Sequence, residues 1–393
     1  MKKDLFTSPD FYNVDKLLSS EQIMVRNSFR DWVKKNVSPI IEDAFERAEF
    51  PKILIKSLAD IGGFGGFLPF KYGGSELDFI SYGLTMQELE RGDSSLRVLS
   101  SIQTSLVINS IYKYGNEKQK LEYLNPLSKG ELIGSFGMTE ANHGSDPRSM
   151  NTTYEERENY FLINGSKMWI GNATICDLAI VWAKDSNNKL AGFIIDRNIE
   201  GFSTLEIKNK YSYRCSITGE LIFENVRVPR EKLLLKCNSF KDLLECLNLA
   251  RYSVSWGVLG IAMECYDVAL TYSKQRKQFG KKIASYQLIQ KKLSEMLIEI
   301  TKSQILVWRL GNLMNNGEAT YEQISMAKLS NVKMSCEVAR VSRSILGGMG
   351  ITGEYPIMRH LMNLETLVSY LGTEEIHTLI LGRKITGIPS FYQ

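Results

Sequence analysis

Apolar residues recur at helical spacing in the first third of the chain. Ser19 and Gln22 precede this stretch three residues apart, and the pair is typical of a capping box at a helix start. The apolar positions that follow lie roughly on one face of a helix: Ile23, Phe29, Trp32, Val33 and Val37. Glycine clusters at 62–66 and 72–74 interrupt the pattern and predict loops. Residues 1–132 are therefore expected to form an N-terminal helical domain.

Shorter runs rich in Val, Ile and Phe replace this spacing between residues 133 and 235. Turn-forming residues bound each run, as expected for strands: the runs cover 160–163, 178–183, 191–195 and 221–228. Asn164-Gly165, directly after the first run, is typical of a tight hairpin turn. We expect a small, barrel-like β domain over 133–235.

Helical spacing returns between residue 236 and residue 393. One apolar stripe there lies opposite charged and polar residues such as Lys291 and Glu295. Such a stripe is more often a packing surface than a binding site; its members are Leu288, Ile289, Leu293, Met296, Leu297 and Ile300. The order helical, β, helical predicts an α+β fold whose last domain is a helical bundle.

Composition narrows the classes of function. The 393 residues carry a net charge of +4, which argues against nucleic-acid binding, and 44% of them are apolar, which is ordinary for a globular protein. No apolar run is long enough to span a membrane, and the first residues resemble neither a secretory signal nor a mitochondrial presequence, so we expect a cytoplasmic protein. Six scattered cysteines and three histidines without ligand spacing predict reduced thiols and no metal site.

Two polar motifs lie in the predicted β domain. Residues 136–146 combine a strand edge, a Thr hydroxyl and a Gly-Ser turn, which together offer several donors to a polar ring and a phosphate; a plain connecting loop is the alternative. Residues 165–173 place Trp169 after a turn, where it could pack on a flat cofactor or simply belong to the core.

Two further motifs lie in the predicted bundle. Residues 276–280, followed by Gln287, offer an Arg for phosphate and a Phe for stacking, or form a solvated helix end. Residues 346–356 hold glycines that let a backbone approach a ligand closely, or form a loop between helices. No GxGxxG follows a strand here, which excludes the Rossmann dinucleotide site.

The joint order of these motifs resembles the acyl-CoA dehydrogenase superfamily, and within it glutaryl-CoA dehydrogenases. The resemblance runs from about residue 8 to 389 and includes segments 88–91, 247–252, 256–260, 286–293 and 379–383. It implies an N-terminal helical domain, a middle β domain and a C-terminal four-helix bundle, a homotetramer, and FAD between the last two domains. An acyl-CoA or acyl-carrier-protein thioester is the implied substrate, and an electron-transfer flavoprotein or oxygen the implied electron acceptor.

The resemblance also assigns site residues. Around the flavin and its pyrophosphate it places Phe136, Met138, Thr139, Gly144, Ser145 and Trp169, with Thr373 and Glu375 nearby. Across a subunit interface it places Arg276, Gln278, Phe279, Gln287, Gly347 and Gly348. Asn248 and Arg251 match positions that meet the pantetheine arm.

The implied acyl pocket has a carboxylate-specific pattern. Glu90, Arg97 and Ser101 match the positions that surround the distal carboxylate in glutaryl-specific relatives. A buried carboxylate needs a charge partner, and Arg supplies a planar fork of donors. Ordinary surface charge is the alternative for Glu90 and Arg97.

The catalytic base of the resembling enzymes has no counterpart here. Those enzymes carry the base as the Glu of a Tyr-Glu-Gly-Thr stretch, and here Leu371 replaces it in Tyr370-Leu371-Gly372-Thr373. Some relatives place the base at another position, which is Ala250 in this chain. Glu374 and Glu375 are expected to start a helix, and Glu90 to be engaged by Arg97. Gly171 likewise lacks the hydroxyl that relatives direct to flavin N5.

Three hypotheses follow. The first is an FAD-dependent acyl-thioester oxidoreductase with an altered base. The second is a decarboxylation in which departing CO₂ leaves the electrons that deprotonation would have supplied. The third is a non-catalytic relative that binds FAD and a thioester.

Overall fold

The computed structural model describes residues 10–237 and 239–390. Its first part is helical, and the predicted capping box is confirmed, because the Ser19 hydroxyl accepts from Gln22 N at the start of the first helix. The helices are α1 (Ser20–Trp32), α2 (Ile41–Arg47), α3 (Leu54–Asp60), α4 (Phe79–Gly92), α5 (Ser94–Ser101), α6 (Asn109–Tyr114) and α7 (Glu117–Ser128). Wide π-helical turns, Val33–Val37 and Ile102–Ile108, continue α1 and α5.

The middle part is one curled sheet of seven strands in the order β1-β4-β2-β3-β7-β6, with β5 on β4. Its strands are β1 (Gly134–Gly137), β2 (Thr153–Glu156), β3 (Tyr160–Gly171), β4 (Leu178–Lys184), β5 (Leu190–Asp196), β6 (Phe202–Glu206) and β7 (Thr218–Pro229). Alternate residues of β4 face opposite sides: Ile180 and Trp182 join the main core, and Val181 joins a second core on the other face.

The predicted hairpin at Asn164-Gly165 is wrong. Both residues lie inside the single long strand β3, and the pairing with β7 shifts register between Ile163 and Gly165, which is the signature of a bulge. A Cβ on Gly165 would come 2.7 Å from Thr152 Cα, so glycine is needed for close approach of the backbone rather than for a turn.

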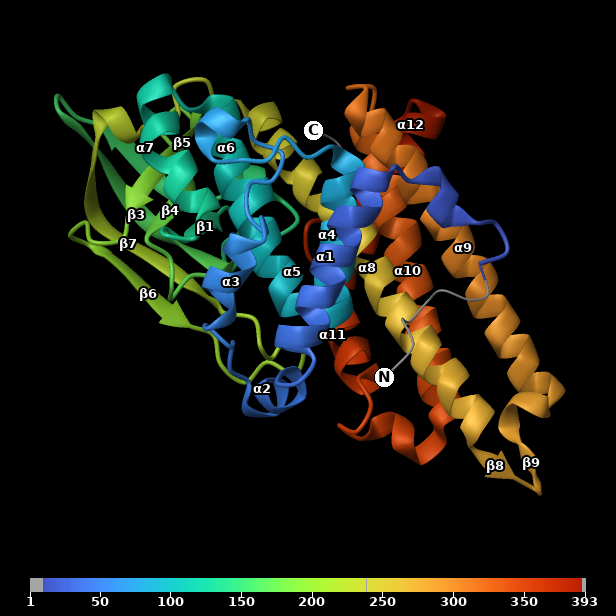
Figure 1. Ribbon diagram of the computed structural model, residues 1–393. Helices are drawn as coiled ribbons and strands as arrows, with labels where there is room; N and C mark the ends of the chain where they lie inside the picture. The colour runs from blue at the N-terminus through green and yellow to red at the C-terminus, as the bar shows by residue number, and fades with distance from the viewer. Residues whose placement is uncertain (1–9, 238, 391–393) are drawn as a thin grey trace.

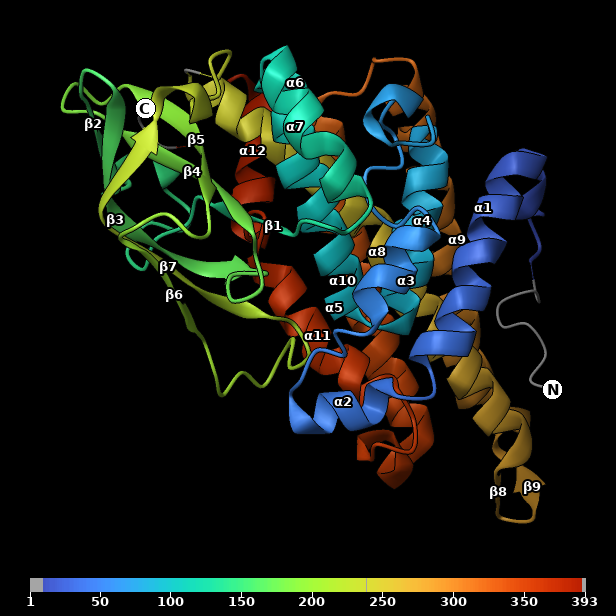
Figure 2. The ribbon, with the colours of Figure 1, turned by 60° about the vertical axis from the view of Figure 1, so that its left-hand side comes forward.

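The last part is a set of long helices. They are α8 (Phe240–Gln275), α9 (Gln287–Asn315), α10 (Tyr321–Leu346), α11 (Ile357–Ser369) and α12 (Glu374–Thr386), and the short strands β8 (Lys277–Gln278) and β9 (Lys281–Lys282) form a hairpin between α8 and α9. Figure 1 shows the sheet on one side, α9 and α10 on the other, and α4 and α5 between them. In the turned view of Figure 2, α1 and α9 lie on the side away from the sheet. The predicted fold class is confirmed; the domain limits at 132/133 and 235/236 remain our proposal.

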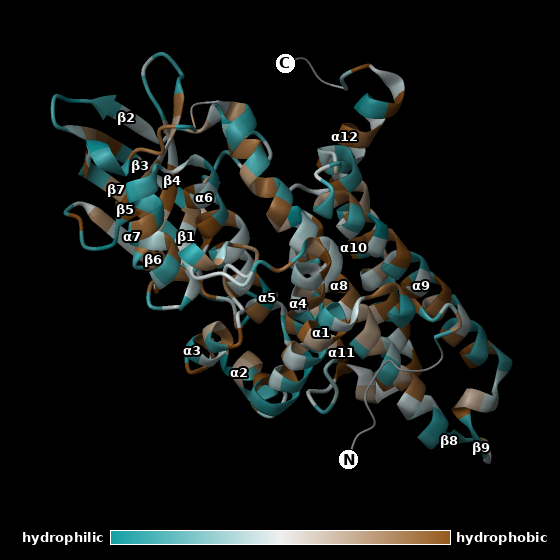
Figure 3. Cartoon of the chain, turned by 45° about the horizontal axis from the view of Figure 1, so that its top comes forward, coloured by the Kyte–Doolittle hydropathy of each residue, from teal (hydrophilic) through white to brown (hydrophobic). Residues whose placement is uncertain are grey.

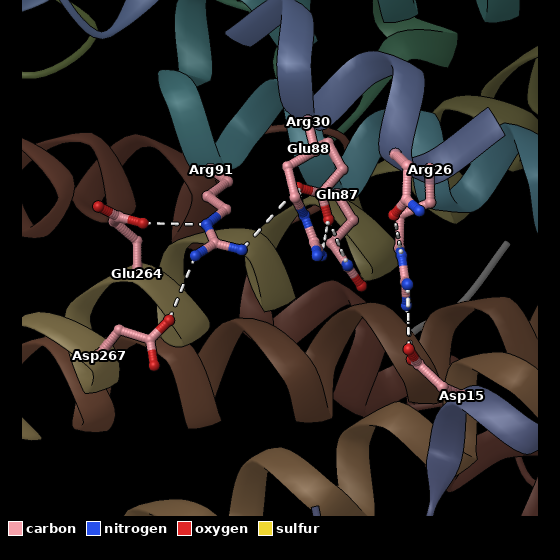
Figure 4. Close-up of polar contacts among 9 residues, drawn as sticks. Asp15, Arg26, Arg30, Gln87, Glu88, Arg91, Glu264 and Asp267 are labelled. Atoms are coloured by element: carbon pink, nitrogen blue, oxygen red, sulfur yellow. Dashed lines mark hydrogen bonds and ion pairs between the residues drawn. The ribbon is translucent and has the colours of Figure 1, made fainter. Parts of the chain in front are cut away.

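Buried ion pairs fasten the N-terminal helices to α8. Arg91 of α4 donates to Glu264 (2.9 Å) and Asp267 (3.2 Å) of α8, and Arg30 of α1 donates to Glu88 of α4 (2.9 Å) (Figure 4). Breaking a buried pair leaves an uncompensated charge, so these contacts fix how the layers meet.

The main core is shared by all three parts of the chain. It runs from the N-terminal helices across one face of the sheet to α8–α11. Of the apolar stripe predicted on α9, Leu293 and Ile300 are buried, whereas Leu288 is 76% exposed. In Figure 3 the β8 strand of the hairpin beyond α8 is hydrophilic. All six cysteines are buried and free.

No helix within residues 10–237 and 239–390 is long and apolar enough to cross a membrane. The same residues contain no group of three metal-ligating side chains.

Candidate active site

A cavity of about 2020 Å³ lies where α5, the sheet, α8 and the start of α12 meet. Ligand pockets commonly measure roughly 300–1,000 Å³, so this one has room for two molecules side by side. Fourteen of the predicted site residues line it: Arg97, Ser101, Phe136, Met138, Thr139, Gly144, Ser145, Trp169, Gly171, Asn248, Arg251, Tyr370, Leu371 and Thr373.

Trp169 forms part of the sheet-side wall. It has a left-handed backbone with φ 64°, and the register of β3 against β7 shifts between Lys167 and Ile170. The bulge turns the indole outward, so that it is 57% exposed and lines the cavity instead of joining the core. A broad exposed ring on a cavity wall is suited to packing against a flat ligand.

The polar segment that starts at Met138 is anchored from beneath by Glu140. Its carboxylate accepts from Lys167 Nζ (2.9 Å), from Thr152 N (2.9 Å) and from the Thr152 hydroxyl (2.7 Å). Thr139 O accepts from Met168 N at 2.8 Å, which joins this segment to β3. Burial lowers the pKa of Lys167 to about 8, against the opposing effect of Glu140. These hydrogen bonds fix the start of the segment that carries the hydroxyl groups of Thr139 and Ser145.

Gly171 ends β3 against the cavity, and a neighbour fills the space where a side chain would go. A Cβ on Gly171 would come 2.2 Å from Ile102 Cδ1, at the end of a flexible side chain. Ile102 belongs to the π-helical turn after α5 and also lines the cavity. The absence of a hydroxyl at position 171 is thus matched by an apolar group packed in its place.

Arg97 lies at the inner end of the cavity in a closed ion pair. Its Nε and Nη2 donate to the two carboxylate oxygens of Glu90 at 2.8 and 3.0 Å, and Nη2 also donates to Tyr213 Oη at 2.8 Å. Both charged side chains are fully buried, and burial raises the pKa of Glu90 while Arg97 opposes that rise. Arg97 Nη1 is buried without a protein partner. Glu90 is therefore engaged as predicted, and does not itself line the cavity.

The loop from Tyr370 to Thr373 forms another part of the cavity wall. Leu371 has φ 55°, an uncommon conformation for a branched residue, and Arg251 Nε donates to Leu371 O at 2.8 Å. Lys328 Nζ donates to Gly372 O at 2.8 Å from α10. A Cβ on Gly372 would come 2.9 Å from His377 Nε2, so the loop packs directly on that ring.

Three basic side chains surround this loop, and burial disfavours the charged form of each. Burial lowers the pKa of Arg251 to about 10 and that of His377 to about 3. Burial, with a smaller contribution from the charge of Arg251, lowers the pKa of Lys328 from 10.5 to about 7. Side chains with these shifts in a cleft are typical of a functional site.

Lys328→Met is expected to raise the free energy of unfolding more at pH 6.5 than at pH 9. The unfolded lysine has a pKa near 10.5 and the folded one near 7, so the unfolded wild type binds more protons between these values and its stability rises with pH. A difference of one in pKa between the folded and unfolded states is worth about 1.4 kcal/mol, and the lost hydrogen bond to Gly372 O costs about 1 kcal/mol. The free energy of unfolding is therefore expected to rise by the order of a few kcal/mol at pH 6.5.

Urea unfolding at both pH values measures this difference. Lys333→Met, at an exposed lysine on the same helix that pairs with Glu374, is the control and is expected to show no such pH dependence. A gain of equal size at pH 6.5 and 9 would contradict the buried-charge explanation.

Besides Glu90, seven predicted residues do not line this cavity in the single chain. Arg276, Gln278 and Phe279 lie at the β8–β9 hairpin, at the far end of α8 (Figure 1), and the others are Gln287, Gly347, Gly348 and Glu375. Glu375 lies in the first turn of α12, as the sequence predicts, with Thr373 as the N-cap. Phe279 is 94% exposed with φ 51°, so the hairpin presents an aromatic ring away from its own chain.

Sequence reasoning missed three residues of the site. Tyr213 contacts Arg97, Lys328 supports the loop at Gly372, and His377 packs beneath it. His377 and Lys328 occupy inward positions of helices, and a burial pattern could have singled them out as polar residues at core positions. No local signal marks Tyr213, which lies in the irregular connection between β6 and β7.

Three domain families match the chain in order. They are described as acyl-CoA dehydrogenase N-terminal domain (residues 19–131), middle domain (135–226) and C-terminal domain (240–386). A crystal structure of glutaryl-CoA dehydrogenase from Mycobacterium smegmatis is 40% identical, with a TM-score of 0.94 over 96% of this chain and 97% of that one. A structure of a glutaryl-CoA dehydrogenase from the same organism in complex with FADH2 is 38% identical, with a TM-score of 0.95 over 97% of this chain and 98% of that one. An acyl-CoA dehydrogenase of Bacillus subtilis is 34% identical over 94% of this chain and 99% of its own length.

Proposed function

This chain belongs to the acyl-CoA dehydrogenase family, and from that premise we propose that it is an FAD-dependent oxidoreductase of an acyl thioester whose acyl chain carries a carboxylate. The observation that carries the proposal is the cavity itself, which has space for two molecules and two arginines, Arg97 and Arg251, on its wall. Glutaryl-CoA dehydrogenase of Mycobacterium smegmatis, whose substrate is such a thioester, is similar over nearly the whole chain.

The sheet-side wall fits a flavin. Trp169 offers an exposed ring, Phe136 and Met138 are apolar, and Thr139 and Ser145 offer polar donors above the Glu140–Lys167 anchor. Adding a Cβ to Gly144 would meet nothing within 4 Å, so the loop leaves open space beside it. Bound FAD supplies the acceptor for a hydride from the substrate β carbon.

Another part of the wall fits the thioester. Asn248 and Arg251 on α8 line the cavity where the pantetheine arm is proposed to pass, and Ser101 and Arg97 lie at its inner end. Ser101 Oγ is hydrogen-bonded to Ser253 Oγ at 2.7 Å, which fixes its position. Arg97 Nη1, which has no protein partner, is one donor available to a distal carboxylate.

Neither of the two positions at which relatives carry the catalytic base has a proton-accepting side chain in this chain. Leu371 and Ala250 both line the cavity, and neither side chain can accept a proton. General-base catalysis is worth roughly 10²–10⁴-fold, so ordinary dehydrogenation is expected to be slow. This favours decarboxylation as a second candidate function, because loss of CO₂ generates an electron pair without a base.

A flavin assay tests the proposal. The purified protein is expected to take up FAD, and anaerobic addition of glutaryl-CoA is expected to perturb the flavin absorbance and to bleach it slowly. A protein that takes up no FAD, or whose bound flavin responds to no acyl-CoA, would overturn the proposed function.

We also propose a homotetramer in which the β8–β9 hairpin of one chain reaches the FAD of another. The exposed ring of Phe279 and the absence of Arg276 and Gln278 from their own chain's cavity support this arrangement. An electron-transfer flavoprotein is the proposed acceptor, with oxygen as the alternative.

A further inference from the structure

Two of the six cysteines form a buried pair at the start of α8. Cys237 lies in the connection that precedes this helix, and Cys246 lies on the helix itself. Both side chains are buried, and the thiol of Cys237 donates a hydrogen bond to the sulfur of Cys246. The two sulfur atoms are therefore in contact, although the residues belong to different elements.

The other four cysteines are arranged differently. Cys176 Sγ donates to Ala173 O at 3.3 Å. The groups whose charge shifts the pKa of Cys215, Cys265 and Cys336 are carboxylates and guanidinium groups. Burial raises the pKa of all four thiols, which keeps them protonated and unreactive. These four serve as small apolar side chains of the core.

Cys246 is the more acidic member of the pair. The hydrogen bond from Cys237 lowers the pKa of the Cys246 thiol, against the opposing effect of burial. Ser110, whose hydroxyl oxygen lies 3.3 Å from Cys246 Sγ, and the ammonium group of Lys113 lower that pKa further. The same hydrogen bond raises the pKa of Cys237, because ionisation of that thiol would break it. The pair therefore combines a nucleophilic sulfur with a protonated partner, which is the arrangement of a redox-active dithiol.

The surroundings of the pair select a small oxidant. Glu245 and Leu247, on either side of Cys246 in the chain, line the cavity, whereas Cys246 itself does not. A bulky disulfide such as oxidised glutathione has no access to a buried pair, but hydrogen peroxide is little larger than water. Two-electron reduction of oxygen, the alternative electron acceptor proposed above, yields this oxidant.

From this arrangement we infer that Cys237 and Cys246 are a site of reversible oxidation, at which hydrogen peroxide forms a disulfide between α8 and the connection that precedes it. The disulfide ties that connection to the helix that carries Asn248 and Arg251 on the cavity wall. The inference goes beyond the proposed function and does not depend on the identity of the substrate.

The oxidation balances in two steps. The thiolate of Cys246 attacks one oxygen of the peroxide, the O–O bond breaks, and hydroxide leaves while Cys246 becomes a sulfenic acid. The sulfur of Cys237 then attacks the sulfur of Cys246, the S–O bond breaks, and water leaves. The two thiols lose two electrons and two protons, and the peroxide gains them to become two molecules of water. The sulfur atoms close from hydrogen-bonding contact to a bond of about 2.05 Å.

Peptide mapping of the FAD-loaded protein tests the inference. Trypsin cleaves after Lys and Arg, so the two cysteines fall in separate peptides, 237–241 and 242–251. After treatment with hydrogen peroxide and alkylation in denaturant, mass spectrometry is expected to show these peptides joined, with a mass two hydrogens below their sum. Dithiothreitol is expected to separate them. Thiol titration in denaturant is expected to show a loss of two of the six thiols.

Variants test the order of the two steps. Cys237→Ser removes the second thiol, so a dimedone adduct of the sulfenic acid is expected to accumulate on Cys246. Cys246→Ser is expected to leave Cys237 unmodified by peroxide. Cys265→Ser removes another buried thiol of α8 and is expected to form the joined peptides as the wild type does. FAD content and circular dichroism establish that each variant is folded.

The outcomes separate this inference from the proposed function. Recovery of both peptides in alkylated form after peroxide treatment, or of Cys246 as a sulfinic acid without the link, overturns the inference. A dimedone adduct on Cys237 in the Cys246→Ser variant, with none on Cys246 in Cys237→Ser, overturns the choice of Cys246 as the nucleophile. None of these measurements uses an acyl thioester, so the flavin assay with glutaryl-CoA decides the proposed function separately.

Discussion

Leu371→Glu is expected to accelerate anaerobic bleaching of the flavin by butyryl-CoA by roughly 10²–10⁴-fold, the usual contribution of a general base. The side chain at 371 lines the cavity, and Glu is close to Leu in length. The left-handed backbone at 371, with φ 55°, costs a Glu about what it costs a Leu, so the exchange adds little strain. Arg251 and Lys328 nearby favour the ionised form of the new carboxyl, as a base requires.

Leu371→Gln is the matched control, because it has the shape of Glu without its basicity. Stopped-flow absorbance is expected to show no acceleration for this variant. Equal acceleration by Gln and Glu, or none by Glu in a protein that binds FAD and butyryl-CoA, would show that the missing base does not limit the reaction.

The order of the elements was predictable because hydrophobic spacing is a local property. The change from helical to strand spacing near residue 133 and back near 236 coincides with the observed change from α7 to β1 and from β7 to α8. The capping box at Ser19 was predictable for the same reason. At Asn164-Gly165 the local signal failed, because tertiary pairing with β7 and the close approach of Thr152 decide the conformation there.

The site was predictable only where its residues lie in motifs. Trp169 and Thr139 are such residues, and both line the cavity. The sequence could not predict which charged side chains form ion pairs, because each buried ion pair joins residues that lie far apart in the chain or on different helices. No local sequence pattern indicates that Arg97 donates hydrogen bonds to Glu90 and Tyr213. Nor does any indicate that Arg251, on α8, donates to the carbonyl oxygen of Leu371.

Breaking the Glu90–Arg97 pair is expected to be among the most damaging single changes in the protein. Glu90→Gln keeps the size of the side chain but leaves the Arg97 charge without compensation in a fully buried position. Loss of one partner of a buried pair costs about 3–5 kcal/mol. Little rearrangement can relieve the charge, because a Cβ on Gly257 of α8 would already come 2.0 Å from Glu90 Oε2, so the pair fills the space between α4 and α8.

The double variant Glu90→Leu/Arg97→Met separates charge from packing. Apolar replacements of similar volume commonly leave the stability of a buried ion pair unchanged or raise it, although here Tyr213 Oη loses the donor that Arg97 Nη2 supplied. Denaturant unfolding is therefore expected to place the double variant nearer to the wild type than Glu90→Gln. If Glu90→Gln unfolds at the wild-type denaturant concentration, the loss of Glu90 does not leave a costly uncompensated charge on Arg97, and the ion pair does not stabilise the contact between α4 and α8.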